Sequence, residues 1–251
     1  MKRILIISLT PVASEPRVIR QAEYFLSKKY EVMVAGFPGK DKLDKRWKFI
    51  DLSNCLDVPY QRSKSIFRYV SPCNIYRAIF RILSFLPSIA DHGYWKNFVY
   101  KRMKNILVEY QSSLIICHDY FTAPLGCELQ KVFKCDFIVD SHEHALTQAK
   151  GMSFFKNLRW AFWVRSYVHG LQKKYLPKAK LVTTVCEGIG ESLANDYCLT
   201  AKPLVVRSVP FYSSEAFNEI PKGYKNIKLL YHGLIAPGRG LEEVIQALHY
   251  S

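Results

Sequence analysis

Short apolar runs alternate along the chain with longer stretches in which apolar positions recur every three or four residues. The first run, Arg3–Ser8, has no polar alternation and predicts a strand that is buried on both faces. A helix is expected over Pro16–Lys28, capped by Ser14, and a second strand over Glu31–Gly36. A strand, a helix and a strand at this spacing predict a right-handed βαβ unit with parallel strands.

The same alternation continues as far as residue 206. It predicts an α/β fold, a doubly wound parallel sheet of about seven strands that is Rossmann-like. The further strands are expected at 47–52, 114–117, 136–140, 180–185 and 203–206, and the further helices at 74–86, 94–110, 122–134 and 189–196.

Serine, proline and glycine interrupt the pattern over residues 208–225, which predicts a linker. A new strand is then expected at 227–231 and a helix at 241–249. One strand and one helix cannot bury a sheet face by themselves. The sequence therefore predicts a Rossmann-like domain over 1–207 and the incomplete start of a second α/β domain over 226–251.

Two of the predicted strands run directly into polar, titratable side chains. Residues 114–117 lead into His118-Asp119, and 137–140 lead into Ser141-His142-Glu143-His144. In open α/β sheets, ligands bind beyond the carboxyl ends of the strands. A polar loop without chemistry would explain one such end, but the pattern occurs twice and predicts a functional edge. We expect His144, like His232, to be structural.

The net charge of +15 is confined to two segments, since residues 61–110 carry +7 and residues 150–180 carry +8. Localised positive charge indicates an anionic partner, such as a membrane surface, a nucleic acid or a phosphorylated substrate. Over 153–175, aromatic side chains are interleaved with basic ones. This pattern is typical of single-stranded nucleic-acid binding and of helices at the lipid headgroup level, and ordinary core helices with solvated charges also produce it.

The cysteines are scattered, odd in number and form no CxxC pair. This argues against a disulfide framework or a structural zinc site and favours a reducing, cytoplasmic compartment. No stretch of eighteen uncharged apolar residues predicts a transmembrane helix. The first loop has no GxGxxG fingerprint, which disfavours a nicotinamide or flavin cofactor. We expect neither a metal site nor a cofactor.

Several stretches together resemble the GT-B glycosyltransferases of the family 4 type, the retaining group that uses nucleotide-sugar donors. Their order and spacing match over essentially the whole chain. The stretches are 14–22, His118-Asp119, 140–143, 182–187, 205–210, 231–233 and 239–242.

The resemblance implies that the donor lies in a cleft between two Rossmann-like domains and is held mainly by the second. His142 matches the amino-domain histidine that reaches the donor sugar, and we expect a positioning or electrostatic role for it. Leu234 stands where the family often has a further basic residue. The donor-binding candidates near the departing phosphate are Gly233, Gly238, Arg239 and Gly240.

The amino-terminal domain of this family mostly binds the acceptor. The candidates on that side are Glu15, Arg17, His118 and Asp119. The basic, aromatic segments suggest a lipid-linked or polysaccharide acceptor and peripheral contact with the inner face of an anionic membrane. No nucleic-acid partner is expected under this interpretation.

The family's glutamate pair, E-x7-E, would come after Ser251. We therefore expect residues 1–251 alone to transfer little sugar. The alternative is a non-catalytic subunit that binds the acceptor or the membrane and needs a separate donor-domain chain.

Overall fold

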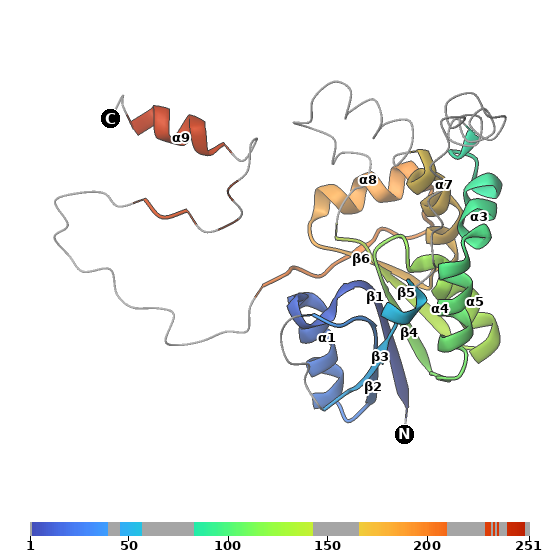
Figure 1. Cartoon of the computed structure of the whole chain (residues 1–251). Coiled ribbons are helices and arrows are strands. Elements are labelled where there is room, and N and C mark those ends of the chain that lie inside the picture. Colours follow the sequence, from blue (N-terminus) through green and yellow to red (C-terminus); the bar gives the residue numbers. More distant parts are fainter. Residues whose placement is uncertain are drawn as a thin grey trace, which may run out of the picture.

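A seven-stranded parallel sheet organises the protein. The computed structural model describes residues 2–39, 46–56, 83–142, 166–209, 229–231, 233, 235 and 240–248. The strands lie in the order β3-β2-β1-β4-β5-β6-β7, which confirms the predicted doubly wound, Rossmann-like α/β fold (Figure 1). Their bounds are β1 Arg3–Pro11, β2 Glu31–Phe37, β3 Lys48–Asp51, β4 Leu114–His118, β5 Asp136–Asp140, β6 Leu181–Thr184 and β7 Leu204–Val205.

Helices cover both faces of the sheet (Figure 1). Helix α1 packs on one face, and α3, α4, α5, α7 and α8 pack on the other. Helix α9 contributes no buried residue. Among the described residues, no helix combines the length and the apolar character needed to cross a membrane. The bounds are α1 Pro16–Ser27, α3 Pro87–Lys96, α4 Phe98–Leu107, α5 Ala123–Phe133, α7 Ser166–Tyr175, α8 Glu187–Tyr197 and α9 Leu241–Ala247, with short 3-10 turns at Val12–Ser14, Ser53–Cys55 and Leu176–Lys178.

Strand β1 lies inside the sheet and is covered on both faces, which explains why apolar and polar residues do not alternate along it. Ile4 and Ile6 pack with Val18 and Ala22 of α1, whereas Leu5 points to the opposite core. Neighbouring side chains on a strand point to opposite faces, so a strand covered on both sides must be apolar throughout.

Two local predictions were wrong. Ser14 does not cap α1, because it belongs to a 3-10 turn in which its hydroxyl donates to the Pro11 carbonyl over 3.1 Å, and Glu15 takes the capping position. The helix expected over 94–110 is divided at Asn97, whose backbone is extended and whose side chain accepts from the Val99 amide. The amide side chain caps α4 in this way, and α3 ends before it.

Other predictions fall partly or wholly outside the described residues. These are most of the helix at 74–86, the first part of the basic aromatic segment, and most of the linker. In the strand expected at 227–231, the described residues 229–231 are not in a strand. A strand needs a hydrogen-bonded neighbour, and the described sheet ends at β7.

Gly170 lies where α7 meets α3 at close range. A Cβ atom on Gly170 would stand 2.4 Å from the Ser84 carbonyl oxygen and 2.7 Å from the Ala90 Cβ. Gly170→Ala should therefore lower the free energy of unfolding by about 1–3 kcal/mol through overpacking. Gly188→Ala is the matched control, because no atom lies within 4 Å of its added Cβ. It should raise stability by about 0.5 kcal/mol through helix propensity. Denaturant titration measures both, and equal effects would contradict the close α7–α3 contact.

Candidate active site

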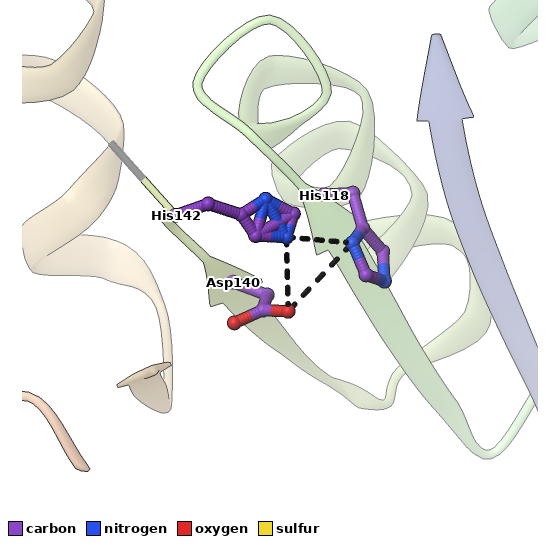
Figure 2. A group of neighbouring side chains, drawn as sticks. All are labelled: His118, Asp140 and His142. Carbon is purple, nitrogen blue, oxygen red and sulfur yellow. Dashed lines mark hydrogen bonds and ion pairs between the residues drawn. The ribbon is translucent and has the colours of Figure 1, made fainter. Parts of the chain in front are cut away.

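The two polar strand ends meet at the carboxyl edge of the sheet. Strands β4 and β5 are paired so that His118 lies directly opposite Asp140. His142 follows two residues after Asp140, and its ring lies against that of His118 (Figure 2). The register of two parallel strands thus brings together residues that the sequence separates, as the strand-end pattern predicts.

Asp140 is the buried anchor of this cluster, with 0% of its surface exposed. Arg17 binds both carboxylate oxygens, with Nε donating over 2.5 Å and Nη2 over 2.7 Å. Thr183 donates to Oδ1 over 2.5 Å, and Gln21 donates to Oδ2 over 3.0 Å. Burial by itself raises the pKa of Asp140, but the bonds from Arg17, the nearby His118 and Thr183 together hold this pKa below its ordinary value.

Arg17 also connects parts of the chain that are far apart. Its Nη1 donates to the Val206 carbonyl over 2.7 Å, just beyond β7. Because Arg17 is only 5% exposed, its guanidinium joins α1, β5 and the end of the sheet inside the protein. Bidentate pairing of this kind fixes geometry as well as charge.

The hydrogen bonds around His118 determine which of its nitrogens carries the proton. Gln21 donates its amide nitrogen to Asp140, so its amide oxygen, 3.0 Å from His118 Nε2, accepts. His118 therefore carries its hydrogen on Nε2 and directs the Nδ1 lone pair toward His142 Nε2, 3.3 Å away. Burial lowers the pKa of His118 to about 4; Asp140 opposes this shift, and His142 and Arg17 add to it.

His142 is the more accessible histidine, with 19% of its side chain exposed. Its Nε2 lies 3.5 Å from Asp140 Oδ2, and its Nδ1 lies 3.5 Å from Asp119 Oδ1. Asp119 adopts a left-handed backbone conformation with φ of 66°, and its amide donates to the Asp140 carbonyl over 2.9 Å. The loop after β4 is thus attached to β5 and holds a carboxylate beside His142.

A cavity of about 420 Å³ opens above this cluster. Its wall contains Glu15, Arg17, Asp119 and His142, four of the residues that the sequence analysis selected. His118 does not line the cavity; it is 1% exposed and contacts His142. The remaining lining residues are Thr10, Val185 and Ser208.

Sequence reasoning did not select Gln21, Thr183 or Ser208. Gln21 stands one helical turn after Arg17, so both reach Asp140 from the same face of α1. Thr183 pairs with Asp140 across β5 and β6. Helical spacing from Arg17 could have indicated Gln21, but strand pairing is needed to indicate Thr183.

Among the described residues, His118, Asp140 and His142 have ligand atoms that all lie within 4.8 Å of one another. From separations of 3.3, 3.5 and 3.6 Å, a central point lies about 2.0 Å from each atom, near a zinc–nitrogen bond length. However, Asp140 Oδ2 already accepts from Arg17 and Gln21, and a divalent cation there would face the Arg17 guanidinium. We therefore interpret the group as a hydrogen-bonded cluster.

The donor-side candidates are described only in part. Gly240 precedes α9 with φ of 77°, a left-handed conformation that favours glycine. Gly233 is described, whereas Gly238 and Arg239 lie outside the described residues. The donor-side site stays a prediction.

Searches with family models and among curated protein sequences found no match. Solved structures similar to the chain include sucrose-phosphate synthase from Thermosynechococcus elongatus, with a TM-score of 0.49 and 13% identity over 81% of this chain and 47% of that one. For Arabidopsis thaliana UGT89C1 complexed with UDP-L-rhamnose, the TM-score is 0.44 and the identity is 13%, over 85% of this chain and 49% of that one. For Streptomyces sp. SF2575 glycosyltransferase SsfS6, complexed with thymidine diphosphate, the TM-score is 0.41 and the identity is 14%, over 77% of this chain and 51% of that one.

The chain thus spans about half the length of these three proteins. At such TM-scores the matches carry no argument about function, and the fold assignment is based on the sheet itself.

Proposed function

We propose that the chain takes part in transferring a sugar, with retention of configuration, from a nucleotide-sugar donor to a polysaccharide or lipid-linked acceptor. The observation that supports this is the placement of His142 in a 420 Å³ cavity at the carboxyl edge of the sheet, with Glu15, Arg17 and Asp119 in the same wall. Four residues chosen for their match to one glycosyltransferase pattern occupy one cavity, although they come from separate parts of the chain.

The wall chemistry suits a ligand rich in hydroxyl groups. Carboxylates such as those of Glu15 and Asp119 accept hydrogen bonds from sugar hydroxyls, and the His142 ring can donate or accept. Because Asp119 and Asp140 flank its two nitrogens, His142 is held in one orientation. Its proposed role is to position a sugar by a hydrogen bond, with His118 and Asp140 holding the ring in place.

On the donor side, the departing nucleoside diphosphate needs stabilisation as negative charge develops. Backbone N–H groups at a helix start and a basic side chain meet that need, and we assign this part to the segment from Gly238 to Gly240 with Arg239. No cofactor besides the nucleotide sugar enters the proposal. The basic segments support a cytoplasmic protein that contacts the inner face of an anionic membrane.

Saccharide binding directly tests the role of His142 in positioning a sugar. In saturation-transfer NMR with a panel of mono- and oligosaccharides and nucleotide sugars, at least one sugar ligand should bind the 251-residue chain. His142→Ala should weaken that binding about fivefold, because losing a hydrogen bond to the ligand costs on the order of 1 kcal/mol. His92→Ala, which truncates an exposed imidazole on α3, should leave the affinity unchanged. A panel without any binder, or equal affinity in wild type and His142→Ala, would reject the proposal.

A further inference from the structure

A second cavity, of about 510 Å³, lies within the helical layer formed by α3, α4, α5 and α7. It shares no lining residue with the cavity at His142. Lys131 and Lys178 line it and come just before β5 and β6, so it lies toward the amino-terminal edge of the sheet. We name it the lysine cavity, after Lys101, Lys104, Lys131, Lys174 and Lys178 in its wall.

The lysine cavity is where the two basic segments of the sequence meet. Lys101 and Lys104 belong to the segment 61–110, and Lys174 and Lys178 belong to 150–180. Helices α3 and α4 pack beside α5 and α7 over one face of the sheet (Figure 1). Lysines from two segments that are far apart in the sequence therefore line one cavity.

Each carboxylate in the wall is already bound to lysine. Asp91 lies 2.5 Å from the Lys174 ammonium, and Glu128 lies 2.5 Å from Lys131 and 3.5 Å from Lys104. Five ammonium groups against two carboxylates leave an excess of three positive charges among the lining residues. Like charges around one cavity raise one another's electrostatic energy, and an anion that enters the cavity lowers it.

Lys101 and Lys178, the two lysines without a carboxylate partner in the wall, contact aromatic rings. The Lys101 ammonium stands 5.9 Å from the Phe98 ring centre, and that of Lys178 stands 5.6 Å from the Tyr175 ring centre. Trp95 Nε1 donates to the Tyr175 hydroxyl over 3.2 Å, and this hydroxyl donates to Asp91. Burial, together with the bond to Asp91, raises the pKa of Tyr175, so the hydroxyl stays protonated and adds no negative charge.

We propose that the lysine cavity binds a phosphate group with two or more negative charges, as in a phosphomonoester or a diphosphate. Lysine ammonium groups bind phosphate as point charges and need no planar fork. An excess of three positive charges matches such a group better than a single carboxylate. The group can belong to a lipid headgroup or to a soluble molecule, since both present the same oxygens.

Two probes distinguish these sources. Inorganic pyrophosphate, titrated calorimetrically at low salt, tests the soluble source. Flotation with phosphatidylcholine vesicles that contain phosphatidic acid tests the lipid source. The variant is Lys101→Ala with Lys178→Ala, which leaves the lysines that hold Asp91 and Glu128 in place. It should weaken binding of the effective probe about tenfold, because charge-assisted contacts are lost.

Lys28→Ala with Lys48→Ala is the matched control. Both residues rest on tyrosine rings outside the cavity, at 5.7 and 4.8 Å from the ring centres, and the change in net charge is the same. It should alter binding by less than about twofold, since distant exposed charges are screened. Selective weakening of pyrophosphate or of vesicle binding supports the proposal and identifies the source.

The proposal is overturned if neither probe binds, or if the two double variants weaken binding equally. Saccharide binding at the His142 cavity should be unchanged in Lys101→Ala with Lys178→Ala. A failure here is thus distinguishable from a failure of the proposed function.

Discussion

Arg17→Leu should lower the free energy of unfolding by about 3–5 kcal/mol, the usual cost of leaving one partner of a buried ion pair without the other. Asp140 would keep its charge at 0% exposure while losing two of its hydrogen bonds. The Val206 carbonyl would lose its bond from Arg17 as well. Urea titration monitored by circular dichroism measures the change.

Arg20→Leu provides the comparison within the same helix. Arg20 lies three residues further along and donates to the exposed hydroxyl of Ser208, so its loss should cost less than about 1 kcal/mol. Adding Asp140→Asn to Arg17→Leu should recover part of the loss, because the stranded charge is removed. An Arg17→Leu protein as stable as Arg20→Leu would show that water reaches Asp140 and that the pair is not buried.

Stability should fall by about 3 kcal/mol as the pH is lowered from 6.5 to 4, through His118 alone. The pKa of His118 is lowered to about 4 in the folded protein, while an unfolded histidine titrates near its ordinary value of 6.5. Between these values the unfolded chain binds the proton and the folded chain does not. The contribution is therefore complete above pH 6.5, shrinks as the pH falls, and is lost at about pH 4.

The groups facing His118 are Gln21, Asp140 and His142, with Arg17 beyond Asp140. His118→Asn removes the titrating ring and should flatten the pH dependence over this window, whatever its baseline stability. His92→Gln on the exposed side of α3 should keep the wild-type slope. Denaturant midpoints at half-unit pH steps measure the slopes. The same slope in His118→Asn and wild type would contradict a buried, neutral His118.

The contribution of Asp140 to stability changes over a lower pH range. Because its pKa lies below the ordinary value of 3.8, its contribution is present above about pH 4 and is lost only as the pH falls further. The two windows separate the histidine from the carboxylate in one titration series.

The sheet and the strand-end residues were predictable from the sequence, since both follow from local pattern. A strand covered on both faces must read as an apolar run, and parallel strands end at one edge, so His118, Asp119 and His142 were identified without coordinates. Thr183 was not identified, because a hydroxyl in a strand carries no signal until strand pairing places it beside Asp140. Gln21 was not selected either, although its helical spacing from Arg17 could have indicated it.

The division of the helical segment at Asn97 also escaped prediction. The apolar stripe formed by Trp95, Val99 and Met103 runs through the break, because the two helices present their apolar sides to one core. The lysine cavity could not be predicted from the sequence either. The charge of each segment could be counted, but their meeting depends on how the helices pack over the sheet.

The bond from Arg17 to the Val206 carbonyl spans 189 residues and has a consequence during protein synthesis. Arg17 leaves the ribosome long before Asp140, and Asp140 long before Val206, so the guanidinium cannot reach its native set of partners until the end of the sheet has emerged. Contacts between distant residues form late and slow folding. A nascent chain stalled before residue 206 would expose an unfinished sheet edge and leave Arg17 without its Val206 partner. We expect such a chain to be bound by chaperones and cleaved by proteases until translation resumes.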